Sequence, residues 1–86
     1  MPAEKTRRRQ ERLAEYSKSV RTASRSRVAR ARAAISADAK SPETADSVKE
    51  AVRALDRAAS KGVIHPNNAA RRKSRLLRRL NKAAAQ

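Results

Sequence analysis

The side chains best able to do chemistry in this sequence are its cations, and the chemistry that they favour is the binding of phosphate groups. Lysine and arginine number 23 against 8 aspartates and glutamates, which gives the 86 residues a net charge of +15. An arginine fork can hold one phosphate through two parallel hydrogen bonds. The densest run of cations contains no acidic residue: Arg71, Arg72, Lys73, Arg75, Arg78, Arg79 and Lys82.

The excess charge is unevenly distributed along the chain. Residues 1–40 carry a net charge of +8, residues 41–61 are neutral, and residues 62–86 carry +7. A surface that only maintains solubility mixes both signs, whereas Arg71, Arg75 and Arg79 recur at a spacing that places like charges together on a helix. Such self-repulsion destabilises a compact chain unless an anion neutralises it. The sequence therefore predicts a polyanionic partner, most simply a nucleic acid.

Catalytic and metal-binding chemistry is not expected. The sequence has a single histidine and no cysteine, which excludes disulfides, thiol nucleophiles and thiolate metal sites. No arrangement offers a nucleophile with a base and an oxyanion donor. There is also no apolar run of membrane-spanning length and no apolar N-terminal signal stretch. We expect a cytoplasmic protein that is not an enzyme and uses no cofactor, metal or small-molecule substrate.

Proline and glycine divide the chain into three helical segments, at about 4–39, 42–61 and 66–84. Ser41 suits an N-cap before Pro42, and Gly62 suits the left-handed position after a helix. Pro66 opens the last segment, with His65 near its cap. No strand pattern competes. We therefore predict an all-α fold, an antiparallel three-helix bundle with an extended basic first helix, formed by residues 1–86 as one domain.

Apolar residues at spacings of three and four predict the buried faces. In the first segment they are Leu13, Tyr16, Val20, Ala23 or Ser24, Val28, Ala31 and Ile35. In the second they are Ala45, Val48, Val52, Leu55 and Ala59. In the third, Ala69, Leu76, Leu80 and Ala83 make one line that also includes Lys73, widened by Ala70 and Leu77. Val63 and Ile64 are expected to close the end of the core, and Tyr16 to pack at its edge. Residues upstream of Leu13 have nothing to bury, so these turns should project beyond the bundle.

The choice between RNA and DNA depends on which recognition modules fit the sequence. One aromatic residue, Tyr16, is too few for modules that stack bases on aromatic side chains. No helix-turn-helix, zinc finger or zipper basic region fits. Structured RNA, which is recognised by its shape, phosphates and 2′-hydroxyls, suits a rigid basic bundle. The alternatives are a histone-like DNA-compacting protein and a basic amphipathic protein of membrane surfaces. Narrow, alanine-rich stripes without tryptophan or phenylalanine disfavour the membrane surface.

One segment resembles a known family. The run from Ala59 to Leu76, ASKGVIHPNNAARRKSRL, is similar over nearly its whole length to the signature of the bacterial small-subunit ribosomal protein S-twenty family. Pro66 departs from that pattern, in which a lysine is usual, and the N-terminal segment matches more loosely. The resemblance implies a three-helix bundle that binds small-subunit ribosomal RNA (rRNA) early in subunit assembly. It also implies a place in the small ribosomal subunit, with other subunit proteins only peripheral and no obligate homo-oligomer.

The candidate RNA-binding residues combine the cation clusters with the positions that match the family run. His65 could cap the third helix or donate to a phosphate, and Asn67 and Asn68 could bind RNA or cap the helix. The complete set is Arg7, Arg8, Arg9, Arg12, Lys18, Arg21, Arg25, Lys61, His65, Asn67, Asn68, Arg71, Arg72, Lys73, Arg75 and Arg79.

Overall fold

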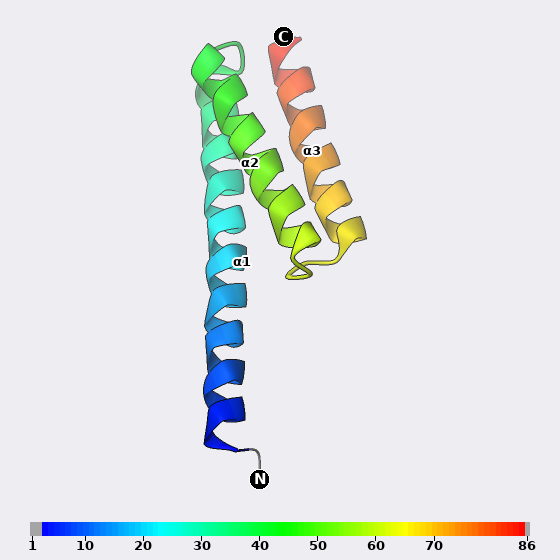
Figure 1. Cartoon of the computed structure of the whole chain (residues 1–86). Helices are drawn as coiled ribbons and strands as arrows, with labels where there is room; N and C mark the ends of the chain where they lie inside the picture. Colours follow the sequence, from blue (N-terminus) through cyan, green and yellow to red (C-terminus); the bar gives the residue numbers. More distant parts are fainter. Residues whose placement is uncertain (1–2, 86) are drawn as a thin grey trace.

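Three helices in sequence order account for nearly all of the chain. The computed structural model describes residues 3–85, and the predicted domain's terminal residues 1, 2 and 86 lie outside that range. Helix α1 spans Glu4–Asp38, α2 spans Pro42–Ser60 and α3 spans Pro66–Ala84 (Figure 1). Residues 3–85 contain no strand. The predicted all-α fold is confirmed, and the helices begin at the predicted residues. The first two end one residue earlier than predicted.

Local signals explain both turns. At the start of α2 the Ser41 side chain accepts a hydrogen bond from the Glu43 amide at 3.2 Å, as an N-cap does. At the end of α2, Gly62 has a φ of +75°. Its amide donates to the Ala59 carbonyl at 3.0 Å, and the Val63 amide donates to the Ala58 carbonyl at 2.9 Å. These two bonds form a Schellman motif, so α2 ends where the glycine predicted.

The junction of α1 and α2 depends on a buried threonine that the sequence pattern did not single out. Thr44 is only 3% exposed. Its hydroxyl lies 2.5 Å from the Asp38 carbonyl oxygen and 3.3 Å from that of Ala34. Carbonyls in the last turn of a helix lack partners within the helix. Thr44 therefore satisfies the end of α1 while it fastens the first turn of α2 to it.

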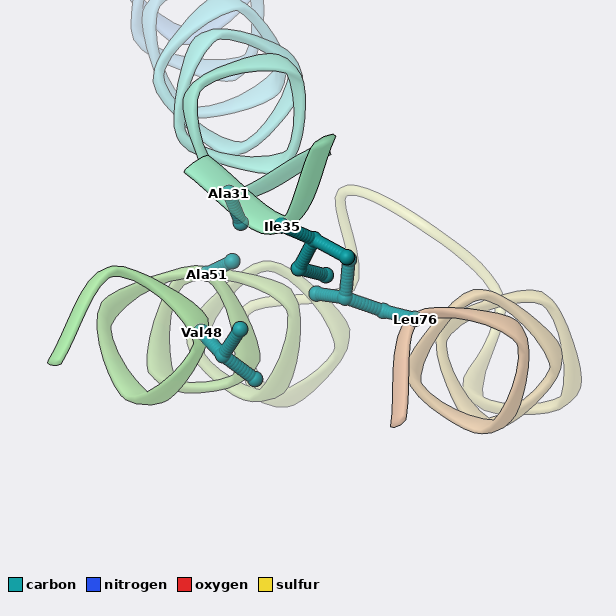
Figure 2. Close-up of a cluster of buried hydrophobic side chains, with 5 residues drawn as sticks. All are labelled: Ala31, Ile35, Val48, Ala51 and Leu76. Carbon is teal, nitrogen blue, oxygen red and sulfur yellow. The ribbon is translucent and has the colours of Figure 1, made fainter. Parts of the chain in front are cut away.

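A small apolar core joins the three helices next to this junction. Ala31 and Ile35 of α1 meet Val48 and Ala51 of α2, and Leu76 reaches them from α3 (Figure 2). Leu55 is fully buried on α2. Alanines on the facing sides of α1 and α2 allow these helices to approach closely, whereas α3 lies mainly beside α2. Few large side chains of α3 pack into this core.

The predicted buried face of α1 was wrong at its N-terminal end. Leu13 is 56% exposed and Tyr16 is 47% exposed, so neither packs in the core. The buried face begins with the half-buried Ser17 and Val20 and continues through Ser24, whose hydroxyl donates to the Arg21 carbonyl at 2.9 Å. The reason is the length of the partner helices. Lys61, directly after α2, lies over the Tyr16 ring at 5.4 Å, and no helix covers α1 upstream of this contact.

The predicted faces of the other helices also need correction. Ala45 is exposed, and the buried face of α2 instead follows Thr44, Val48, Ala51, Leu55 and Ala58, with Ala54 beside it. Alanines on both flanks of the apolar stripe of α2 give little contrast in size, so the rotation of the helix could not be predicted exactly. On α3, Ala70 and Leu77 are exposed.

The first helix extends well past the other two. The described residues measure 60 × 21 × 13 Å along their principal axes. At a rise of 1.5 Å per residue, the 35 residues of α1 are about 24 Å longer than the 19 of α2. Every residue from Ala3 to Tyr16 is exposed. The predicted projection of the N-terminal turns is confirmed (Figure 1), and we call residues 3–16 the N-terminal arm.

Candidate nucleic-acid interface

An open groove between α1 and α3 brings together arginines from both ends of the sequence. It has a volume of about 490 Å³. Its apolar floor is formed by Val28, Ala29 and Leu76. Its cationic lining consists of Arg25 and Arg32 from α1 and Arg72, Arg75 and Arg79 from α3. We call this feature the arginine groove. Four of its five arginines are among the residues predicted to bind RNA.

The arginine groove contains positive charge without compensation. No carboxylate lines it, and all five arginines are exposed. Ion pairs elsewhere in residues 3–85 involve Arg7, Arg8 and Lys73, and none involves a groove arginine. Five cations on two facing helices create a positive potential that attracts anions. The fold thus brings arginines from the two positively charged outer segments together at one site.

Arg32 is the member of the arginine groove that was missing from the predicted set. It follows Arg25 by seven residues, so two helical turns place both on one face of α1. This face borders the buried stripe that includes Val28. The sequence signal for Arg32 is its position beside the apolar stripe. It does not belong to a dense run of cations, which was the signal used to select residues.

The N-terminal arm carries a second, separate group of predicted cations. Arg7, Arg8, Arg9 and Arg12 are all exposed on it. Glu4 holds two of them, because one of its carboxylate oxygens lies 3.1 Å from Arg7 and 3.4 Å from Arg8. Salt bridges this exposed are weak, so a phosphate can displace them. Lys18 and Arg21 continue the exposed surface of α1 toward the arginine groove.

The start of α3 is fixed by the only histidine. His65 is the N-cap, and its Nδ1 accepts a hydrogen bond from the Asn67 amide at 3.1 Å. The structure therefore supports the capping role that we weighed against phosphate binding. The cap uses the backbone of Asn67, whose side chain stays exposed, while Asn68 is half-buried. The Asn67 side chain is therefore more accessible to a ligand than that of Asn68.

Two predicted cations make contacts within the protein. Lys73 Nζ lies 2.7 Å from Asp56 Oδ1, which joins α3 to α2, and its side chain is 33% exposed. Lys61 Nζ lies 5.4 Å from the centre of the Tyr16 ring, a cation–π contact between the end of α2 and α1. Arg71 is exposed on α3 but does not line the arginine groove. These three residues are not gathered with the groove arginines.

Other classes of site find little support in the described residues. Residues 3–85 contain no group of three or more histidines, cysteines, aspartates or glutamates placed to hold a metal ion. Across the same range, none of the helices has the length and apolar character that crossing a bilayer requires.

Comparison with known proteins places this basic bundle in a family. The model of the family "Ribosomal protein S20" matches residues 2–81. The "Small ribosomal subunit protein bS20" of Heliobacterium modesticaldum is 50% identical over 66 residues, which cover 76% of this chain and 73% of that protein. The protein of the same name from Roseiflexus sp. is 63% identical over 41 residues, which cover 48% of this chain and 46% of that protein.

A shorter match with the same name comes from Dehalococcoides mccartyi, at 73% identity over 30 residues, or 35% of this chain and 34% of that protein. The matched segment thus spans half or less of the Roseiflexus and Dehalococcoides relatives. The family model nevertheless covers nearly the whole chain, which confirms the resemblance predicted from residues 59–76 and agrees with a non-enzymatic role. The chain belongs to the ribosomal protein S20 family.

Proposed function

We propose that this protein is a constituent of the small ribosomal subunit in the cytoplasm that binds small-subunit rRNA directly, mainly through the phosphate backbone. Binding stabilises the folded rRNA during subunit assembly. The observation that carries the proposal is the arginine groove, in which five arginines from the two outer helices face one another without a carboxylate. The printed names of the relatives, each a small ribosomal subunit protein, favour rRNA over other polyanions.

The proposed interface has two parts with different roles. The arginine groove holds backbone phosphates against the bundle, and the N-terminal arm, whose helical residues 4–16 span about 20 Å, extends along an RNA surface (Figure 1). Phosphate contacts fix position and orientation without reading the base sequence. Structured RNA presents its phosphates in a particular shape, and a rigid groove with a long arm can match that shape. The whole described range, residues 3–85, then acts as one RNA-binding unit.

The remaining predicted residues support this interface to different degrees. Lys18, Arg21, Asn67 and Arg71 are exposed and remain proposed RNA ligands. Lys61, His65 and Lys73 make contacts within the protein, so we propose that they mainly position the helices. Contacts with other small-subunit proteins are peripheral in this proposal, and the protein needs no second copy of itself.

Co-sedimentation tests the function. A tagged full-length chain is mixed with small ribosomal subunits depleted of their salt-extractable proteins, and the particles are pelleted through a cushion after a high-salt wash. The proposal predicts retention on the small-subunit particle and none on the large subunit. Equal retention on both, or complete loss in the wash while other small-subunit proteins remain, would refute it.

A further inference from the structure

We propose that the arginine groove is a binding site for linked phosphate groups and that its occupancy holds α3 against α1. The natural ligand is a short run of backbone phosphates or another phosphate chain of the same chemistry. The inference deepens the proposed function, on which it rests only for the source of those phosphates. It adds that folding of the bundle and ligand binding are coupled through this one groove.

Charge repulsion between α1 and α3 opposes a thin apolar contact. On α3 only Ala69 and Leu76 are buried, with Leu80 and Ala83 partly buried. Against this thin apolar contact stand Arg25 and Arg32 on one side of the groove and three arginines on the other. Like charges on facing elements repel each other across the groove. A bound anion replaces this repulsion with attraction, because each phosphate attracts arginines from both helices at once.

The ion pairs of the described residues all lie away from the α1–α3 contact. Within residues 3–85 the acidic partner of α3 is Asp56, which binds Lys73 on the α2 side of the helix. No ion pair in that range joins α3 to α1. The α1–α3 contact thus sets arginines of both helices against each other without an ion pair between these helices in residues 3–85. An external anion is the simplest group that completes it.

The shape of the groove favours a phosphate chain over a single ion. Arg72, Arg75 and Arg79 lie along one face of α3 over two turns, which is about 10 Å at 1.5 Å per residue. Arginine binds phosphate oxygens through its planar fork. Several linked phosphates can therefore engage successive arginines, whereas one ion cannot reach them all.

The test compares two pairs of substitutions that change the charge equally. The groove variant is Arg32→Gln/Arg75→Gln. The matched control is Arg30→Gln/Arg78→Gln, in which both residues are exposed on the same two helices but lie outside the groove. Helix content is followed during heating of the full chain, in sodium tripolyphosphate, in a short single-stranded oligouridylate, and in sodium chloride of equal ionic strength.

The inference predicts opposite results in the two kinds of solution. In chloride alone the groove variant melts at or above the control, because repulsion is relieved. In tripolyphosphate or oligouridylate the wild type and the control gain about 5 °C or more in melting midpoint, and the groove variant loses most of that gain. The variant Arg32→Lys/Arg75→Lys keeps the charge without the fork and should gain an intermediate amount. The anion that acts at the lower concentration identifies the source as nucleic-acid backbone or free polyphosphate.

Two outcomes would overturn the inference: no gain by the wild type over chloride with either probe, or an equal loss of the gain in the groove variant and its control. Co-sedimentation of the wild type with the small subunit separates this failure from failure of the proposed function. If the melting experiment contradicts the inference while the wild type still pellets with the small subunit, the protein binds RNA but binding at the groove is not coupled to folding. If the thermal results hold but the wild type does not pellet, the groove stands and the ribosomal role fails.

Discussion

The Lys73 ammonium lies 2.7 Å from the Asp56 carboxylate and joins α3 to α2 on the side opposite to most of the positive charge. This ion pair sets Lys73 apart from the arginines of α3 that line the groove. Lys73 supports the bundle, while Arg72, Arg75 and Arg79 border the arginine groove. Residues that are neighbours in sequence thus serve different purposes, because a helix turns by about 100° per residue.

The first prediction separates these two purposes. Lys73→Met should lower the free energy of unfolding by about 0.5–1 kcal/mol, the upper part of the range for exposed ion pairs, because the lysine is half-buried. Asp56→Asn should have a similar effect, and the double variant should lose less than the sum of the two. Urea denaturation measures all three. Additive losses, or a larger loss of rRNA affinity for Lys73→Met than for Arg72→Gln, would place Lys73 in the RNA interface instead.

The second prediction concerns the cap of α3. His65→Ala should destabilise the protein by about 1 kcal/mol, because the Asn67 amide loses its acceptor. His65→Asn should retain most of the stability, since asparagine is a good N-cap. Chemical denaturation, followed by helix content, gives both values. A loss of rRNA affinity in both variants with unchanged stability would show that the imidazole contacts a phosphate rather than the helix.

The third prediction concerns the N-terminal arm. Removal of residues 1–12 should leave the melting midpoint nearly unchanged, since the described residues of that segment are all exposed. The truncated chain should bind rRNA more weakly, and the log–log slope of affinity against salt should fall by about two to three units as phosphate contacts are lost. Filter binding over a range of salt concentrations measures the slope. A large drop in melting midpoint would mean that the arm supports the bundle.

The fourth prediction uses a matched pair of leucines to test the packing. Leu55 is fully buried on α2 and Leu77 is 42% exposed on α3. Leu55→Ala should cost about 2–5 kcal/mol, because it leaves a cavity between the helices. Leu77→Ala should fall within about 0.5 kcal/mol of the wild type, as surface substitutions usually do. Equal costs at the two positions in urea denaturation would contradict the packing described for α2.

Helix positions could be predicted from the sequence because they depend on local signals. Ser41 and Gly62 act within a few residues of their place in the chain, and both do what their types predict. The resemblance of residues 59–76 also identified the family that the comparison confirmed. In both cases a short stretch of sequence contains the whole signal.

Features that depend on how the helices meet could not be predicted in this way. Leu13 and Tyr16 continue the apolar spacing of α1, but α2 and α3 are too short to cover them. Thr44 looks polar in sequence, yet it is buried because its hydroxyl reaches the carbonyls of α1. Arg32 joins the arginine groove only because α3 lies beside it. Each depends on the relative length and rotation of helices distant in sequence.

The most direct test of the central claim is a competition between two nucleic acids for the full-length protein. Labelled small-subunit rRNA is bound at about 0.2 M salt, where non-specific phosphate contacts are weakened, and is challenged with equal amounts, by phosphate, of unlabelled rRNA or duplex DNA. The account predicts that rRNA displaces the label at a concentration at least about tenfold lower than DNA, a difference of about 1.4 kcal/mol. Equal displacement by both competitors would contradict it and favour a DNA-compacting protein.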